Sequence, residues 1–198
     1  MVSITHYLKS RNALLLLLLS LGLLITASQK ISAGPSPAAI SIHHSELMLK
    51  DDHYHLIARV DYQLNETVME ALHNGVSITI ESQSRLQRLR KWVWNSTINH
   101  TEQRYKLRYF ALSQLYLVTD LSNNSKRSFL TLTAALYHLG QLDIKLAPKH
   151  AVLRGQPHRY SMRIFLNLDS LPAPLRPLAY LSTQWSLTSK WQHWHITP

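Results

Sequence analysis

Histidine is the residue type whose chemistry stands out first, because the chain of 198 residues holds twelve of them. The best cluster is Asp52, His53 and His55. On a β-strand the two histidines would point to the same side, and two imidazoles with a nearby carboxylate can bind one metal ion. The alternative is a set of solvent-facing side chains on a half-buried strand. Because no third and fourth ligand follows at a fixed spacing, we predict no metal site here. A second cluster, His193 and His195, is equally incomplete.

The usual patterns for catalysis are missing from the sequence. No Gly-x-Ser-x-Gly motif occurs, and Ser113 lies in an apolar run where its hydroxyl would bond to the backbone. The acidic residues are scattered rather than paired, and the five glycines form no phosphate-binding loop. The absence of cysteine excludes a cysteine nucleophile, a disulfide and a thiolate zinc site. We therefore expect a protein that is not an enzyme, with no catalytic residues and no cofactor.

A basic and aromatic stretch is the strongest candidate for a binding surface. Arginine and tryptophan together are typical of hot spots in protein interfaces and of segments at the membrane surface. The alternative is a solvated strand face whose tryptophans fold into the core, since clustered charge is usually solvated surface. The candidate binding residues are Arg88, Arg90, Lys91, Trp92, Trp94, Arg104, Lys106 and Arg108.

The elements that must position these residues are mainly β-strands. Residues 54–64 alternate between apolar and polar types, and residues 40–50 do so with a change of parity near His44 to Glu46, which predicts a bulge. Asp51-Asp52 supplies a turn, so the two segments form a hairpin. Val76 to Tyr109 forms a second, longer hairpin whose distal half is basic and aromatic.

The segment 104–119 lies at the centre of this pattern. Up to Tyr109 its alternation would place apolar and aromatic side chains on one face of a strand and basic side chains on the other. After Tyr109 polarity nearly vanishes, which predicts a strand covered on both faces or a passage through the core. The first face would hold Tyr105, Leu107 and Tyr109, and the second Arg104, Lys106 and Arg108.

Two short helices and further strands complete the expected fold. Asn65 and Thr131 are natural N-caps for helices that end at Gly75 and Gly140. Residues 171–181 contain three prolines and would pack as a crossing or capping segment. We predict a mainly β protein: an antiparallel two-layer β-sandwich of about seven to nine strands, immunoglobulin-like in outline, with two short connecting helices and an N-terminal signal helix. The remaining strands are expected at residues 115–121, 126–130, 142–146, 160–168 and 185–194.

The N-terminus predicts export. Lys9 and Arg11 precede an uninterrupted apolar run, residues 13–27, which is typical of a secretory signal peptide and shorter than the roughly 20 residues that span a bilayer. The alternative is that the same run is an uncleaved anchor in the inner membrane, with the domain facing the periplasm. In both cases we expect the domain in the periplasm after Sec export. We assign residues 1–33 to the signal peptide and the start of a linker, 34–39 to a Pro/Gly linker, and 40–198 to a single β-sandwich domain.

The formal net charge of +10 at pH 7 limits the classes of partner. A basic soluble domain often binds nucleic acid, but an exported one rarely meets any, so we expect no nucleic acid. The partners that we expect instead are an envelope or inner-membrane protein, or an anionic membrane surface. The simplest alternative is that the charge only keeps the protein soluble.

Several ordered motifs resemble one known family. They are Asn74-Gly75-Val76, Arg104-Tyr105-x-Leu-x-Tyr109, Ala111-Leu112-Ser113-Gln114-x-Tyr116-x-Val118-Thr119, Arg127-Ser128-Phe129, and Leu171 to Ser182. The family they resemble is the proteobacterial family catalogued as domain of unknown function 4390, and the resemblance covers residues 40–194. It implies an exported, Sec-dependent protein, often encoded beside a two-component sensor kinase and its regulator. It assigns no catalytic residues.

Three functions follow as hypotheses. The first is a non-enzymatic periplasmic interaction or accessory domain of the cell envelope, linked to a sensor kinase or another membrane protein. The second is a sandwich that holds a small or lipidic molecule between its layers, which a sizeable apolar pocket would favour. The third is a metal-dependent enzyme, which three histidines or carboxylates converging on one point would favour.

Overall fold

The structure is a computed structural model, and it describes residues 39–90, 94–152 and 155–196. The predicted signal peptide or anchor, and the linker up to residue 38, lie outside the described residues. All described residues belong to one compact unit of the chain. In that unit, none of the described helices is long and apolar enough to cross a bilayer.

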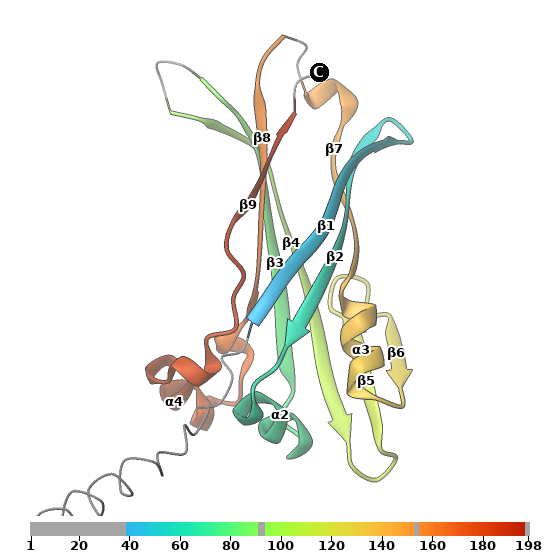
Figure 1. Cartoon of the computed structure of the whole chain (residues 1–198), viewed down its shortest axis with the longest axis vertical. Coiled ribbons are helices and arrows are strands. Elements are labelled where there is room, and N and C mark those ends of the chain that lie inside the picture. The colour runs from blue at the N-terminus through green and yellow to red at the C-terminus, as the bar shows by residue number, and fades with distance from the viewer. Residues whose placement is uncertain (1–38, 91–93, 153–154, 197–198) are drawn as a thin grey trace, which may run out of the picture. The chain divides into compact units, whose positions relative to one another are not determined.

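The described residues form nine strands in two sheets, and every pair of neighbouring strands is antiparallel (Figure 1). The three-stranded sheet has the order β1-β2-β7 and consists of β1 (Ala39–Lys50), β2 (His53–Gln63) and β7 (Gln141–Pro148). The six-stranded sheet has the order β6-β5-β4-β3-β8-β9 and consists of β3 (Ile78–Arg88), β4 (Ser96–Phe110), β5 (Leu115–Asp120), β6 (Lys126–Phe129), β8 (His158–Leu166) and β9 (Gln192–Ile196).

The core lies between the two sheets. Alternating side chains of each sheet point inward and are buried, because successive residues of a strand face opposite sides. Two hydrogen bonds also join the layers: the Trp194 indole Nε1 donates to Ser45 Oγ (2.9 Å), and the Asn99 amide donates to the Leu146 carbonyl. The predicted antiparallel two-layer sandwich is therefore confirmed. Its most deeply buried apolar residues include Leu56, Ile80, Leu107, Ile144, Met162 and Ile164.

Local sequence explains the first hairpin. Asp51 and Asp52 have φ angles of +50° and +57°, which two-residue hairpin turns require and which Asp tolerates. A register shift between Ile42 and His44 lies at the predicted change of parity in β1. The bulge thus lets residues on both sides of the shift keep their apolar side chains toward the core.

Both predicted helices are present. Helix α2 (Glu66–His73) begins where Asn65 Oδ1 accepts a hydrogen bond from the Val68 amide (3.0 Å). Helix α3 (Leu132–Leu139) begins where Thr131 Oγ1 accepts one from the Ala134 amide (3.2 Å). The proline-rich segment forms a short 3₁₀ turn, η3 (Ala173–Leu175), and a third helix, α4 (Arg176–Leu181). Further 3₁₀ turns are η1 (Lys149–Ala151), η2 (Leu168–Ser170) and η4 (Thr183–Trp185).

The apolar stretch after Tyr109 corrects one prediction. Instead of running through the core, residues 111–114 form an exposed turn between β4 and β5, and the Leu112 side chain is fully exposed. Gln114 closes this turn with a φ of +53°. Two antiparallel neighbours need a tight connection at this point, and that requirement overrides the apolar composition.

The last strand is shorter than predicted. β9 begins at Gln192, and the residues from Thr183 to Trp185 form the 3₁₀ turn η4. The predicted alternation still holds before the strand starts, because Trp185, Leu187 and Ser189 are all buried.

Candidate binding face on the six-stranded sheet

The outer surface of the six-stranded sheet carries a concentration of basic side chains. In β4, Leu107 is buried whereas Arg104, Lys106 and Arg108 are exposed, so the predicted division of this strand into two faces is present. Residues paired across antiparallel strands point to the same side, and the register thus adds side chains of neighbouring strands to this surface. We call it the basic face, and its cations are Arg85 of β3, Arg104, Lys106 and Arg108 of β4, Lys126 of β6, and Arg159 and Arg163 of β8.

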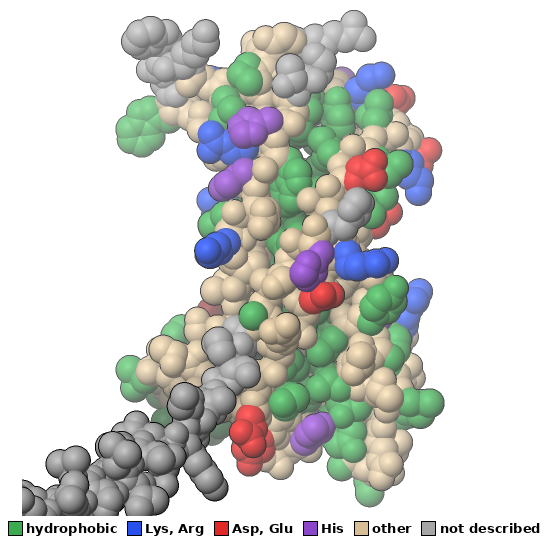
Figure 2. Space-filling model, viewed as in Figure 1, with side chains coloured by type: hydrophobic (Ala, Val, Ile, Leu, Met, Phe, Trp, Pro, Cys, Tyr) green, Lys and Arg blue, Asp and Glu red, His purple; other side chains and the backbone are tan. Residues whose placement is uncertain are grey.

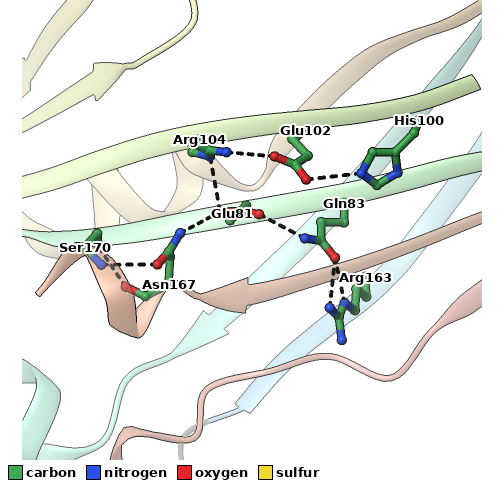
Figure 3. Close-up of polar contacts among 8 residues, drawn as sticks. All are labelled: Glu81, Gln83, His100, Glu102, Arg104, Arg163, Asn167 and Ser170. Carbon is green, nitrogen blue, oxygen red and sulfur yellow. Dashed lines mark hydrogen bonds and ion pairs between the residues drawn. The ribbon is translucent and has the colours of Figure 1, made fainter. Parts of the chain in front are cut away.

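A buried carboxylate anchors the middle of the basic face (Figure 3). The side chain of Glu81 is only 5% exposed, and its Oε2 lies 3.2 Å from Arg104 Nε. The same carboxylate accepts hydrogen bonds from Asn167 Nδ2 (2.6 Å) and Gln83 Nε2 (3.1 Å). Three donors from three segments satisfy this charge, as a buried ion requires.

The network extends to both sides of Glu81 (Figure 3). Glu102 accepts from Arg104 Nη2 (2.7 Å) and lies 3.1 Å from His100 Nε2. These hydrogen bonds, that of Arg104 first, hold the pKa of Glu102 below its usual value. On the other side, Arg163 donates from Nε and Nη2 to Gln83 Oε1, at 3.1 and 2.8 Å. Arg104 and Arg163 are thereby held in fixed orientations.

Two cations of β4 have no such partner. Within the described part of the chain, no carboxylate lies within ion-pair distance of Lys106 or Arg108. The Arg108 guanidinium instead lies 4.8 Å from the centre of the Phe110 ring. This end of the basic face therefore presents uncompensated positive charge to solvent.

At the other end, Trp191 lies against two arginines. The centre of its ring is 5.1 Å from the Arg85 guanidinium carbon and 5.0 Å from that of Arg163. Ser161 Oγ and His193 Nδ1 are 2.8 Å apart beside them. A shallow pocket of about 190 Å³ lies here, lined by Arg85, Gln87, Arg159, Ser161, Trp191 and His193. Figure 2 shows basic and histidine side chains gathered over β8 and β9.

The distal end of the β3–β4 hairpin, where other candidates were predicted, is organised differently. Arg88 shares its side of β3 with the buried Leu86, and its Nε is buried without a hydrogen-bond partner in the described structure. Trp94 is 92% exposed. The Arg90 amide donates to Asn95 Oδ1 (3.3 Å), and Lys91 and Trp92 lie outside the described residues. Arg88 therefore lies on the side of β3 opposite the basic face, and none of the described contacts joins Arg90 or Trp94 to that face.

The weak metal candidates of the first hairpin each have a different environment. His53 Nδ1 bonds to the Asp51 carbonyl (2.9 Å), and His55 Nδ1 lies 2.7 Å from Asp143 Oδ1 on β7. Asp52 occupies the hairpin turn. No group of three His, Asp or Glu residues in residues 39–90, 94–152 and 155–196 could hold a metal ion.

Comparison with known proteins identifies the family of the chain. The model of the family described as Domain of unknown function (DUF4390) matches residues 38–195. The chain belongs to this family. The resemblance drawn from the motifs is thus confirmed, whereas no curated protein and no solved structure matches the chain.

A second polar cluster of this DUF4390 chain lies inside the sandwich. His158 is fully buried and pairs with Arg88 across β3 and β8, and Tyr160 is the next inward residue of β8. Among the described residues, Arg88 Nε, His158 Nε2 and Tyr160 OH have no hydrogen-bond partner. Burial raises the pKa of Tyr160, although the nearby Ser84 hydroxyl acts in the opposite direction. His158 Nδ1 lies 2.8 Å from the Gln156 carbonyl and must donate to it, so in the neutral ring Nε2 is an acceptor.

Two further pockets among the described residues are small. One of about 180 Å³ lies among Tyr105, Val118, Asp120, Ser125, Arg127 and His138, and one of about 240 Å³ among Glu102, Arg104, Leu121 and Ser122. Their linings mix charged and apolar groups. Neither of these pockets, nor the one beside Trp191, is the sizeable apolar cavity that a lipidic ligand would need.

Sequence reasoning missed Arg159, Arg163 and Trp191 as site residues. The sequence predicted a strand at residues 160–168, but it did not indicate that Arg159 and Arg163 belong to a binding surface. What the sequence lacked was the register that brings them beside Arg85 of β3, far away in the chain.

Proposed function

We propose that this DUF4390 protein is an exported, non-enzymatic accessory domain of the cell envelope, which binds an acidic segment of a membrane or envelope protein through the basic face. The observation that carries the proposal is the pair Lys106 and Arg108, both exposed and both without a carboxylate at ion-pair distance among the described residues. Such a surface attracts negative charge and fixes the orientation of a partner.

The distribution of charge on the basic face supports a binding role. Arg104 is neutralised by Glu81 and Glu102, whereas Lys106 and Arg108 on the same strand are left to interact with something else. Because all three lie on one face of a strand in the middle of a sheet, the positive charges are held on a rigid surface. A partner would meet a prearranged array rather than side chains on a mobile loop.

The location and the class of partner belong to the proposal as well. The apolar run at residues 13–27 after Lys9 and Arg11 supports Sec export to the periplasm. The family resemblance supports a sensor kinase as one partner to examine. A reporter enzyme that is active only in the periplasm, fused after the domain, tests the location.

Photocrosslinking in living cells tests the proposed surface. A photoreactive residue at Ser128 lies on the basic face, since Ser128 pairs with Leu117 and Leu117 with Arg108. The matched control is Ile57, which is exposed on the outer side of the other sheet. We expect position 128 to capture one reproducible envelope protein that position 57 does not capture. The same products from both positions would reject the basic face as the interface.

A second candidate function, contact with an anionic membrane surface, is favoured by helix α4. Its Leu178, Tyr180 and Leu181 are 65%, 59% and 87% exposed, and α4 lies at the same end of the domain as α2 and the β4–β5 turn (Figure 1). Apolar side chains near basic ones bind anionic bilayers. Flotation with vesicles of phosphatidylglycerol tests it: Leu178→Ser with Leu181→Ser should abolish binding, and a wild-type protein that does not float rejects it.

A further inference from the structure

The pocket beside Trp191 has the composition of an anion site. Two guanidinium groups line it, from Arg85 on β3 and Arg159 on β8. The register brings them together, because Arg85 pairs with Ser161 and Gln87 pairs with Arg159. The two arginines are thus diagonal neighbours on one side of the sheet, within reach of a single small ligand.

The positive charge in this pocket is not neutralised by the chain. Among the described residues, no carboxylate lies within ion-pair distance of Arg85 or Arg159. The nearest acids of the face, Glu81 and Glu102, are both bound to Arg104. Two guanidiniums close together repel each other, so an anion between them is favourable.

Trp191 holds one wall of the pocket in place. Its ring contacts the guanidiniums of Arg85 and Arg163, and Arg163 is itself fixed by two hydrogen bonds to Gln83. Contact with an indole restrains a guanidinium while its N–H groups remain available to donate. Trp191 therefore preorganises Arg85 for a ligand.

The pocket also offers a hydroxyl and an imidazole. Ser161 Oγ and His193 Nδ1 are within hydrogen-bond distance of each other, and both residues line the pocket. Together with the two arginines they supply donors from several directions. A tetrahedral oxyanion with three or four acceptor oxygens uses such donors better than a planar carboxylate does.

We propose that this pocket binds a phosphate group, with Arg85 and Arg159 as its main ligands and Trp191 as a positioning residue. The inference goes beyond the proposed function, which depends on Lys106 and Arg108. The phosphate is either free inorganic phosphate or the phosphomonoester head group of a lipid, and these two sources share the same chemistry.

The test follows the indole N–H signal of Trp191 by NMR in the protein purified as the cell produces it. Trp191→Phe identifies the signal among those of the five tryptophans. At constant ionic strength, we expect saturable shifts with inorganic phosphate and none with acetate. Arg85→Gln should weaken phosphate binding about tenfold, because it removes one charge-assisted hydrogen bond. Lys145→Gln, an exposed change on the other sheet, should leave it unaltered.

Three results would overturn the proposal: no saturable shift, an equal shift with acetate, or undiminished binding in a correctly folded Arg85→Gln protein. Vesicles containing phosphatidic acid distinguish the sources, because binding to them that Arg85→Gln weakens identifies a lipid head group. The double variant Lys106→Glu and Arg108→Glu should retain phosphate binding. The experiments can therefore reject phosphate binding without rejecting the proposed function, and the reverse.

Discussion

Arg104 on β4 reaches across to β3, where its Nε lies 3.2 Å from Oε2 of the buried Glu81. We expect Glu81→Gln to lower the free energy of unfolding by about 1–3 kcal/mol, because the amide replaces a charged acceptor with a group that also presents donors to Asn167 and Gln83. Urea unfolding followed by circular dichroism measures the loss. Since Arg104 is half exposed, most of the effect comes from the buried hydrogen bonds rather than from the ion pair.

The matched control for Glu81 is Glu102→Gln on the neighbouring strand. Glu102 also binds Arg104, but it is far more exposed, so its loss should change the unfolding free energy by less than about 1 kcal/mol. Equal effects of the two variants would contradict the central role of Glu81 in the network.

Gly140 tests the contact between α3 and β2. A Cβ at this position would lie 2.1 Å from the carbonyl oxygen of Val60, and the Val60 amide donates to the Gly140 carbonyl (2.9 Å). We expect Gly140→Ala to destabilise the fold by about 2–4 kcal/mol, since the backbone of β2 must move. Gly75→Ala serves as control, because Gly75 has a φ of +84° in open space and its change should cost about 1 kcal/mol. The reverse order would show that α3 does not pack as described.

Asn65 combines a helix cap with a tertiary contact. Its Oδ1 accepts from the Val68 amide, and its Nδ2 donates to the carbonyl of Gln184 in η4 (2.5 Å). Asn65→Ala should therefore cost about 2–3 kcal/mol, and Thr131→Ala, which removes a cap alone, about 1 kcal/mol. Asn65→Asp keeps the oxygen that caps the helix and loses the N–H donor to Gln184. Its loss of stability should therefore lie between those of Thr131→Ala and Asn65→Ala. An Asn65→Asp protein as stable as wild type would show that the hydrogen bond to Gln184 does not stabilise the fold.

His138 should make stability depend on pH. Burial, and then the nearby charge of Arg127, hold the pKa of His138 below its usual value. His138 then binds its proton more tightly in the unfolded chain than in the folded one. The free energy of unfolding therefore decreases as the pH falls from about 6.5 through the lower folded-state pKa. An NMR titration should show His138 below 6.5, and Arg127→Gln should raise its pKa while Lys145→Gln should not. A pKa of 6.5 or above in the wild type would contradict the burial of this ring.

The two faces of β4 were predictable from the sequence. Alternation alone separated Arg104, Lys106 and Arg108 from Leu107, because a half-buried strand must have a period of two. The caps Asn65 and Thr131 likewise indicated both helices, since a cap is a local interaction. In contrast, the exposed turn at residues 111–114 could not be told from a core strand, because its composition is apolar and its geometry depends on a φ of +53° at Gln114.

The sequence predicted only part of the candidate site. Clustering along the chain drew attention to Arg88 and Trp94, whereas the surface depends on the register that places Arg85 beside Ser161 of β8. Pairing between distant strands is a tertiary property that no local pattern encodes. For the same reason Arg88, which looked like a surface residue, turned out to share its side of β3 with the buried Leu86.

The central claim, that the basic face binds an acidic envelope partner, is tested most directly by charge reversal combined with crosslinking. The photoreactive residue stays at Ser128, and the yield of the crosslinked partner is compared between wild type, the double variant Lys106→Glu and Arg108→Glu, and the control Lys145→Glu on the outer side of the other sheet. We expect the double variant to lose the product and the control to keep it, because only the former places negative charge against an acidic segment. An unchanged yield in a folded double variant would contradict the claim.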